Sequence, residues 1–182
     1  MKLLLIGLFL WSGAHLFQRL APRLRASMGA RAKGIVAIVS VLGVLAMIVG
    51  YRSWESAQVW NPPAAMTQVN NILMVLAVYF FAASGMKTRL SGRVRHMQLT
   101  GVKIWAVAHL LVNGDLASIV LFGGLLAWAV VSVIAINRAE PNWLRPEPAP
   151  IGKEIGAVVG AVVAAVVIGY AHTFFNLLPF GG

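Results

Sequence analysis

Six runs of mostly apolar residues follow one another along the chain, and charged residues collect in the short segments between them. A bilayer core of ~30 Å needs roughly 20 apolar helical residues to cross it. The runs therefore predict about six membrane-spanning helices, at about residues 2–20, 34–51, 66–86, 97–113, 115–137 and 155–178. We expect residues 1–182 to form a single integral membrane domain, an all-α, polytopic transmembrane helical bundle. The run at 97–113 is the weakest, because Lys103 lies inside it.

Composition favours the same class of protein. The chain is 59% hydrophobic and only 11% charged, with a mean hydropathy of +0.81, whereas a soluble domain has about 25% charged residues. Cysteine is absent, which excludes disulfides, thiolate metal sites and a cysteine nucleophile. The formal net charge of +10 suggests nucleic acid at first, but no nucleic-acid-binding motif accompanies the basic residues. We expect the lipid bilayer, and no nucleic acid, as a partner.

The basic residues alternate between the two sides of the predicted bundle. Thirteen of the fifteen lie in the first, third and fifth loops, with Lys103 counted in the third, and only Lys2 and Arg52 lie on the other side. Cytoplasmic loops carry an excess of lysine and arginine, so both termini are predicted to be non-cytoplasmic. The first run begins at Lys2 but lacks a small-residue cleavage site, so we expect a retained helix rather than a secretory signal.

The fifth loop, residues 138–154, is rich in proline. Proline at this density favours extended chain over helix, so the loop is predicted to be a strap on the cytoplasmic face, with a partner-binding role as the alternative. Four small residues then recur at intervals of four: Gly152, Gly156, Gly160 and Ala164. This spacing lets two membrane helices approach closely, and we interpret it as a packing seam.

The four histidines are the main candidates for function, because ionisable residues inside a membrane are rare. His15, His109 and His172 lie within predicted spans, and His96 lies at the cytoplasmic surface. The lack of cysteine and the few acids disfavour zinc and di-iron carboxylate sites. Imidazoles on facing helices are what haem b needs, since axial ligands and apolar packing hold it. Haem b is therefore the expected cofactor, and haem iron the expected metal.

Depth in the membrane separates the ligand pairs. At ~1.5 Å per residue, His15 lies ~6 Å from the middle of its span toward the cytoplasm, while His109 and His172 lie ~6 Å and ~8 Å toward the outside. Depth therefore favours His109 with His172 and leaves His109 with His15 as the second choice. Hydrogen-bonded packing is the alternative role for His172, and an interfacial position is favoured for His96.

His109 has supporting neighbours. Trp105, His109 and Asn113 share one helical face at i, i+4 and i+8, so an aromatic ring, an imidazole and an amide are presented to one place. Asp115 could deliver protons to such a site, but it is predicted to be the N-cap of the next span.

A short repeat links the two tryptophan–histidine pairs. The segment 7–16, with Trp11 and His15, matches 101–110, with Trp105 and His109, at five positions. The two segments lie in spans of opposite sense, as a 3+3 inverted repeat would have them. The match does not continue into the following spans, and we interpret it as coincidence.

The segment 92–122 contains Arg95-His96, Trp105-Ala-Val-Ala-His109-Leu-Leu and Asn113-Gly114-Asp115-Leu-Ala-Ser-Ile-Val-Leu-Phe122. It resembles the NnrU family, polytopic bacterial membrane proteins of which some are named for an association with nitrite and nitric oxide reduction. Gly13-Ala14-His15-Leu16 before a basic loop also fits, so the resemblance covers most of the chain. A plant relative of the family, 15-cis-zeta-carotene isomerase, carries a b-type haem with histidine ligands. The resemblance implies His15 and His109 as ligands, which differs from the pairing by depth.

The chain departs from the family at Met97, where proline is usual. The Arg95-His96-x-x-x-x-Gly101 string is also similar to isoprenylcysteine-type methyltransferases and sterol reductases, which bind their cofactors at such a cytoplasmic-side motif. Arg95 and His96 therefore mark an alternative site in the loop.

Three hypotheses follow for a protein of the bacterial cytoplasmic (inner) membrane. The leading one is a haem b enzyme that acts on a lipophilic substrate, with an activity like polyene or isoprenoid cis–trans isomerisation, or that is linked to nitrite or nitric oxide reduction. The second is a non-catalytic membrane subunit or assembly factor of a larger respiratory, denitrification or photosynthetic complex. The third is an isoprenylcysteine-type methyltransferase or a reductase, for which we expect no cofactor binding.

Overall fold

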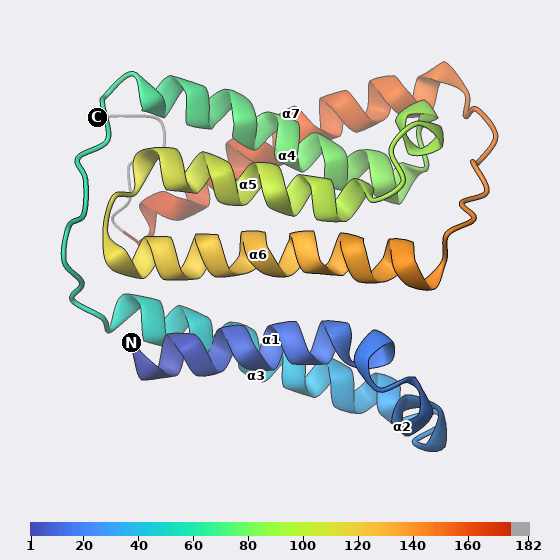
Figure 1. Ribbon diagram of the computed structural model, residues 1–182. Helices are drawn as coiled ribbons and strands as arrows, with labels where there is room; N and C mark the ends of the chain where they lie inside the picture. The colour runs from blue at the N-terminus through green and yellow to red at the C-terminus, as the bar shows by residue number, and fades with distance from the viewer. Residues whose placement is uncertain (176–182) are drawn as a thin grey trace.

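The computed structural model describes residues 1–175, and the regular elements in that part of the chain are helices (Figure 1). They are α1 (Lys2–Leu20), α2 (Pro22–Ser27), α3 (Arg31–Arg52), α4 (Met66–Met86), the short 3-10 helix η1 (Arg89–Gly92), α5 (Met97–Val112), α6 (Leu116–Ala139) and α7 (Ile151–Thr173). Helices suit these apolar runs because in lipid each segment has to satisfy its own backbone hydrogen bonds. The predicted all-α, polytopic fold is confirmed.

Five of the described helices are long and apolar enough to cross a membrane: α1, α3, α4, α6 and α7. The sixth predicted span, α5, has 16 residues, which is about 24 Å at 1.5 Å per residue. It packs between α4 and α6 and runs beside both (Figure 1). The run that was weakest in sequence is therefore a shorter apolar helix in the middle of the molecule.

The last helix departs most from its predicted bounds of 155–178. It begins at Ile151, directly after Pro150, and ends at Thr173. Proline is tolerated at the start of a helix because the first backbone N–H groups have no partner within the helix. The helix therefore starts as soon as the strap ends and finishes its crossing earlier. Residues 176–178 of the prediction lie outside the described part of the chain.

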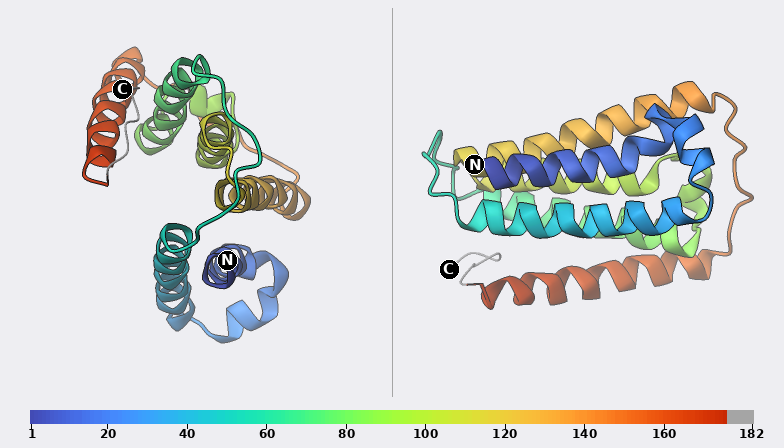
Figure 2. Two further views of the ribbon diagram at one scale, coloured as in Figure 1. Left: turned by 90° about the vertical axis from the view of Figure 1, so that its left-hand side faces the viewer. Right: turned by 90° about the horizontal axis from the view of Figure 1, so that it is seen from below.

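The helices form a curved row in the order α3, α1, α6, α5, α4 and α7 (Figure 2). Each helix packs chiefly on its neighbours in this row. The hairpin of α1 and α3 thus lies on one side of α6, and α5, α4 and α7 lie on the other. This arrangement puts α6 at the base of the space between the two groups.

The hairpin of α1 and α3 is held by direct contact between backbones. A Cβ atom on Gly7 would lie 2.6 Å from the Met47 nitrogen, and one on Gly50 would lie 2.3 Å from the Leu4 nitrogen. Only glycine permits such an approach, as at other small-residue helix contacts in membranes. Gly43, seven residues before Gly50, makes a third such contact with α1. The sequence analysis did not single out this pair, although a spacing of two helical turns is its signal.

The small residues of α7 show that the predicted packing seam is displaced by one position. Gly152 and Gly160 have nothing within 4 Å of an added Cβ, and only Gly156 of the predicted glycines faces α4, at Met86. The buried positions of α7 are Ala157, Ala161 and Gly169. The seam against α4 therefore follows the stripe that starts at Ala157, because that stripe is the one turned toward α4.

Three loops lie at one end of the molecule, on the right in Figure 1: residues 21–30, 87–96 and 140–150. Together with the helix ends beside them, they carry most of the basic residues. Met1 and the C-terminal end of α7 lie at the opposite end (Figure 1). Cytoplasmic loops carry an excess of lysine and arginine, so we expect the first end, here called the basic end, to face the cytoplasm. The other, called the outer end, carries the N-terminus (Figure 1).

The strap, residues 140–150, has no helix or strand, as its prolines predict. Arginines hold it against the basic end. The Arg19 guanidinium lies 2.7 Å from the Glu140 carboxylate, Arg95 donates to the Glu140 carbonyl, and Arg89 Nε donates to the Ala149 carbonyl at 2.9 Å. Hydrogen bonding and charge from Arg19 hold the pKa of Glu140 below its usual value. The strap is therefore anchored to both groups of helices.

The loop 53–65 closes the outer end. Asp115 caps α6, since its carboxylate accepts hydrogen bonds from the Ser118 N–H at 2.9 Å and from the Ser118 hydroxyl at 2.5 Å. The Ser56 hydroxyl of the loop donates to the same carboxylate at 2.9 Å. Burial disfavours the charged carboxylate, but these hydrogen bonds outweigh it and hold the pKa of Asp115 below its usual value. The predicted N-cap is confirmed.

Candidate functional site

Two adjoining cavities lie over α6, between α1 and α5. The basic-end cavity has a volume of about 840 Å³, and the apolar chamber, toward the outer end, has about 490 Å³. Four side chains line both: Trp11, Phe81, Val102 and Trp128. Ligand sites commonly have volumes of ~300–1,000 Å³. We call the two together the cleft.

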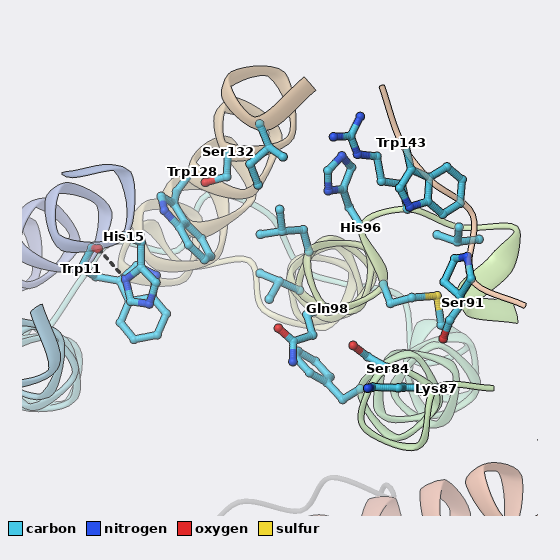
Figure 3. A pocket seen from close by; sticks show the side chains of 18 residues that line it. Trp11, His15, Ser84, Lys87, Ser91, His96, Gln98, Trp128, Ser132 and Trp143 are labelled. Carbon is cyan, nitrogen blue, oxygen red and sulfur yellow. Dashed lines mark hydrogen bonds between the residues drawn. The ribbon is translucent and has the colours of Figure 1, made fainter. Parts of the chain in front are cut away.

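The basic-end cavity is lined by α1, α4, α5, α6, the loop before α5 and the strap. α1 gives Trp11 and His15, α4 gives Ser84, α6 gives Ser132, and the strap gives Trp143 (Figure 3). The loop before α5 and the start of α5 add a further polar set: Lys87, Ser91, Arg95, His96 and Gln98. No acidic residue is among the residues that line this cavity. Its charge is therefore positive.

The apolar chamber has a different character. Its lining is almost wholly hydrophobic and comes from α1, α3, α4, α5 and α6: Trp11, Val44, Met47, Ile48, Tyr51, Arg52, Phe81, Val102, Trp105, Leu121, Leu125 and Trp128. Tyr51 lies near its outer limit, where the phenol oxygen is 2.9 Å from the Ser118 hydroxyl. The cleft thus changes from basic and polar to apolar along the direction of the helices.

His15 is the predicted haem ligand that lines this cleft. Its Nδ1 lies 2.9 Å from the Trp11 carbonyl, and its ring lies 4.0 Å from the Trp11 ring centroid and 5.3 Å from that of Trp128. A carbonyl at Nδ1 implies that Nδ1 carries the proton, which leaves the Nε2 lone pair available to a metal. Two indoles also restrict the ring.

His109 has the same local geometry but different surroundings. Its Nδ1 lies 2.9 Å from the Trp105 carbonyl, and its ring packs 4.9 Å from Trp105 and 4.5 Å from Phe122. Asn113, the third residue of the predicted face, donates to the His109 carbonyl instead of extending the site. His109 lines neither of the two cavities.

The structure separates His15 from His109. They pack on Trp128 and Phe122 of α6, six residues apart and so ~9 Å apart along the helix axis. The His172 Nδ1 lies 2.7 Å from the Ile168 carbonyl.

The two residues of the cytoplasmic-side loop motif both line the basic-end cavity. Arg95 is also tied to the strap, and the His96 Nε2 lies 2.8 Å from the Asn137 side-chain oxygen. The loop motif and His15 are therefore parts of one site, which the sequence analysis treated as separate sites.

Three polar atoms in the lining have no hydrogen-bond partner in the described structure: Trp11 Nε1, Trp128 Nε1 and Ser132 Oγ. Trp128 and Ser132 are only 8% and 6% exposed. They lie four residues apart on α6, on one face. A buried donor without a partner costs about 1–3 kcal/mol, so both are unusual in a helix that crosses lipid.

Several residues of the cleft were missed in sequence, above all Lys87, Phe81, Trp128 and Ser132. A serine four residues after a tryptophan in an otherwise apolar span was the available signal for the last two. Nothing in the sequence indicated that Lys87 and Phe81 face the same space as His15, because that depends on how α4 packs across α5.

The fold and the cleft define a class, a multi-pass helical membrane protein with a cavity between its helices that is basic at one end and apolar at the other. Within that class the family is shown by comparison. The profile of the NnrU protein family matches residues 3–179, and the chain belongs to this family. No curated protein and no solved structure matches the chain.

Proposed function

We propose that this NnrU family protein binds haem b in the cleft and acts there on a lipophilic substrate in the bacterial cytoplasmic membrane. The observation that supports the proposal most is the position of His15. It is a histidine within a membrane helix, it lines a cavity of about 840 Å³, and its Nε2 is left available by the bond at Nδ1.

The residues around His15 fit a flat, apolar cofactor on one side. Trp11 and Trp128 fix the imidazole from two directions, and Phe81 and Val102 provide apolar wall. His15 would hold the iron, and the indoles would exclude water from it. Haem b, when bound, would supply an iron centre able to interact with a polyene or with a nitrogen oxide.

A second histidine to hold the haem would come from His109 or His172. Both lie near the outer ends of their helices, α5 and α7, and would form the alternative ligand pair. His15 paired with His109 would need the hairpin of α1 to move relative to α6, since the two histidines now pack at different levels of α6. In the haem proposal we therefore place His15 first.

A visible absorption spectrum tests the proposal. Protein expressed with ample haem and purified in detergent should show a Soret band. His15→Ala should abolish or shift the low-spin bands, and His96→Ala, a histidine of the same cavity that is bonded to Asn137, should leave them in place.

Two results would oppose this assignment. A wild-type protein without a Soret band would contradict haem binding altogether. A band lost in His109→Ala or His172→Ala but kept in His15→Ala would move the haem out of the cleft to the outer pair.

A second candidate function is a non-catalytic subunit or assembly factor of a larger membrane complex. It is favoured by α7, which packs chiefly on α4 and leaves Gly152 and Gly160 with open space beside them. Co-purification with a large complex, together with normal turnover of that complex by a His15→Ala variant, would support it. The third, a methyltransferase or reductase, is tested by titration with S-adenosylmethionine or a nicotinamide cofactor.

A further inference from the structure

The polarity of the cleft is graded along its length. The basic-end cavity contains Lys87 and Arg95 and no acidic residue, and the apolar chamber continues from it past Phe81 and Val102. A purely apolar ligand would leave Lys87 without an acidic partner and Arg95 with only the Glu140 carboxylate, 3.9 Å away, beside a low-dielectric space. The gradient therefore matches a ligand with one anionic end and one apolar end.

Lys87 adds an independent observation. Its backbone lies in the left-handed region, at φ 53° and ψ 57°, where it ends α4. Glycine is the residue that usually takes this position after a helix, and other residues take it at a cost. The Lys87 ammonium has no acidic partner among the described residues. A strained lysine without a partner, in the lining of a cavity, suggests that its side chain serves a ligand.

Arg95 leaves part of its charge available. One of its nitrogens donates to the Glu140 carbonyl, and the nearest Glu140 carboxylate oxygen is 3.9 Å away. Glu140 is engaged more closely by Arg19, at 2.7 Å. Since a guanidinium has five N–H donors, Arg95 can hold the strap and still bind an anion in the cavity.

Two side chains of the cavity lining carry unsatisfied hydrogen-bonding groups as well. The Trp128 indole N–H and the Ser132 hydroxyl have no partner, are more than nine-tenths buried, and belong to side chains that line the cavity. An indole N–H can only donate, so the group that satisfies it must be an acceptor. An ester, carboxylate or phosphate oxygen of a ligand would meet this need.

From these observations we infer that the cleft binds an anionic amphipath, with a phosphate or carboxylate head group in the basic-end cavity, which Lys87 and Arg95 line, and a hydrocarbon chain in the apolar chamber. The inference rests on the part of the proposed function that puts a lipophilic substrate in the cleft, and it does not depend on haem. It assigns a substrate class to that site: phosphorylated prenyl or acyl-type lipids, whose oxygen acceptors would lie near Trp128 and Ser132.

Matched probes test the head group. Purified protein in nanodiscs of a neutral lipid is titrated with farnesyl phosphate and farnesol, with palmitate and hexadecanol, and with inorganic phosphate, and binding is followed by quenching of tryptophan fluorescence. Each anionic amphipath should bind at least about tenfold more tightly than the alcohol with the same chain, because a hydrogen bond to a charged group is worth ~1.5–3 kcal/mol. Inorganic phosphate should not bind at the same concentrations.

Variants locate the binding. Lys87→Gln and Arg95→Gln should each reduce the preference for the anionic probe about tenfold. Arg138→Gln is the matched control, a basic residue exposed at the same end that does not line the cavity. Lys87→Gly removes the cation and introduces glycine, the residue that adopts the left-handed conformation most readily. It should therefore lose the preference while its thermal midpoint stays equal or rises, which separates loss of binding from loss of folding.

Four results of the titrations with these probes and variants would overturn the inference. They are equal affinity for phosphate and alcohol, binding of inorganic phosphate as tight as that of the amphipath, an Arg138→Gln effect as large as that of Lys87→Gln, or no effect of Lys87→Gln and Lys87→Gly. Haem propionates are a rival source of carboxylate, so protein expressed with and without added haem is compared. Loss of phosphate-probe binding in haem-loaded protein would also overturn the inference. A missing Soret band with the preference intact would contradict only the haem proposal.

Discussion

At the scale of single residues, the same tryptophan–histidine arrangement occurs twice in the chain. His15 and His109 each stack on the tryptophan four residues earlier, and each has Nδ1 at that tryptophan's carbonyl. The glycine four residues before each tryptophan also makes a close approach, Gly7 to α3 and Gly101 to α4. The five matching positions that were interpreted as coincidence therefore share a local geometry, in helices of opposite sense (Figure 1).

The residues of the cleft were predictable where they depended on local sequence. A histidine in an apolar helix and an i, i+4 tryptophan are visible in one segment, so His15 and Trp105 of the cleft could be named, as could His109, which does not line it. The neighbours Lys87, Ser132 and Trp143 come from three other segments, and only the packing brings them together. Local periodicity also cannot tell that His109 would be covered by Phe122.

Asp115 is expected to stabilise the outer end in a pH-dependent manner. Its pKa is lower in the folded protein, so its contribution is present above the unfolded pKa of about 3.9 and is lost as pH falls through the folded value. Asp115→Asn should cost about 1 kcal/mol at neutral pH, because asparagine can still cap the helix but its neutral amide oxygen accepts weaker hydrogen bonds than the carboxylate. Thermal midpoints of the wild type and the variant in detergent should converge at low pH, below that unfolded value.

The control for this prediction is Glu55→Gln, an exposed carboxylate in the same loop. It should change the midpoint little at any pH. A gap between Asp115→Asn and the wild type that stays constant down to the lowest pH would show that the capping bond, rather than the charge, matters.

At the scale of helices, the contact of α1 with α3 leaves no room for a methyl group. An added Cβ on Gly50 would lie 2.3 Å from backbone, so Gly50→Ala should destabilise the protein by about 1–3 kcal/mol, as overpacking does. Gly34→Ala, in the same helix with open space beside it, should be neutral or slightly stabilising. Thermal unfolding in detergent compares the two, and equal effects would contradict the close approach.

The seam of α7 yields a second comparison. Ala161 is 1% exposed against α4, whereas Gly160 has nothing within 4 Å of an added Cβ. Ala161→Leu should therefore lower the thermal midpoint, and Gly160→Leu should leave the isolated protein unaffected. If Gly160→Leu instead destabilises an oligomer of the protein, the stripe formed by Gly152, Gly156 and Gly160 contacts another chain.

Helix positions were largely predictable because apolar runs and their basic or proline-rich boundaries are visible in the sequence alone. α1 and α4 have their predicted bounds. The side of α7 that faces α4 was not predictable, because Gly156 and Ala157 belong to two adjacent stripes of small residues. Which stripe meets α4 depends on the angle at which the strap delivers α7, and a tether from Arg89 to Ala149 helps to set it.

At the scale of the whole molecule, the charge pattern predicts which end faces the cytoplasm. The chain has no cysteine, so single cysteines can report its orientation. In right-side-out vesicles, a membrane-impermeant thiol reagent should label Ala57→Cys at the outer end. It should label Glu147→Cys in the strap only after the membrane is made permeable. The reverse pattern would invert the topology and place the basic-end cavity outside.

The curved row of helices has a consequence for the order of synthesis. α1 and α3 are neighbours in sequence and can pair as soon as both have entered the bilayer. Their partner surface on α6, where Leu8 packs over Gly124, is made about seventy residues later, roughly 4–14 s at ~5–20 residues per second. During that interval the hairpin must persist in lipid without α6. The glycine contacts that bring its two backbones together therefore serve biogenesis as much as the finished protein.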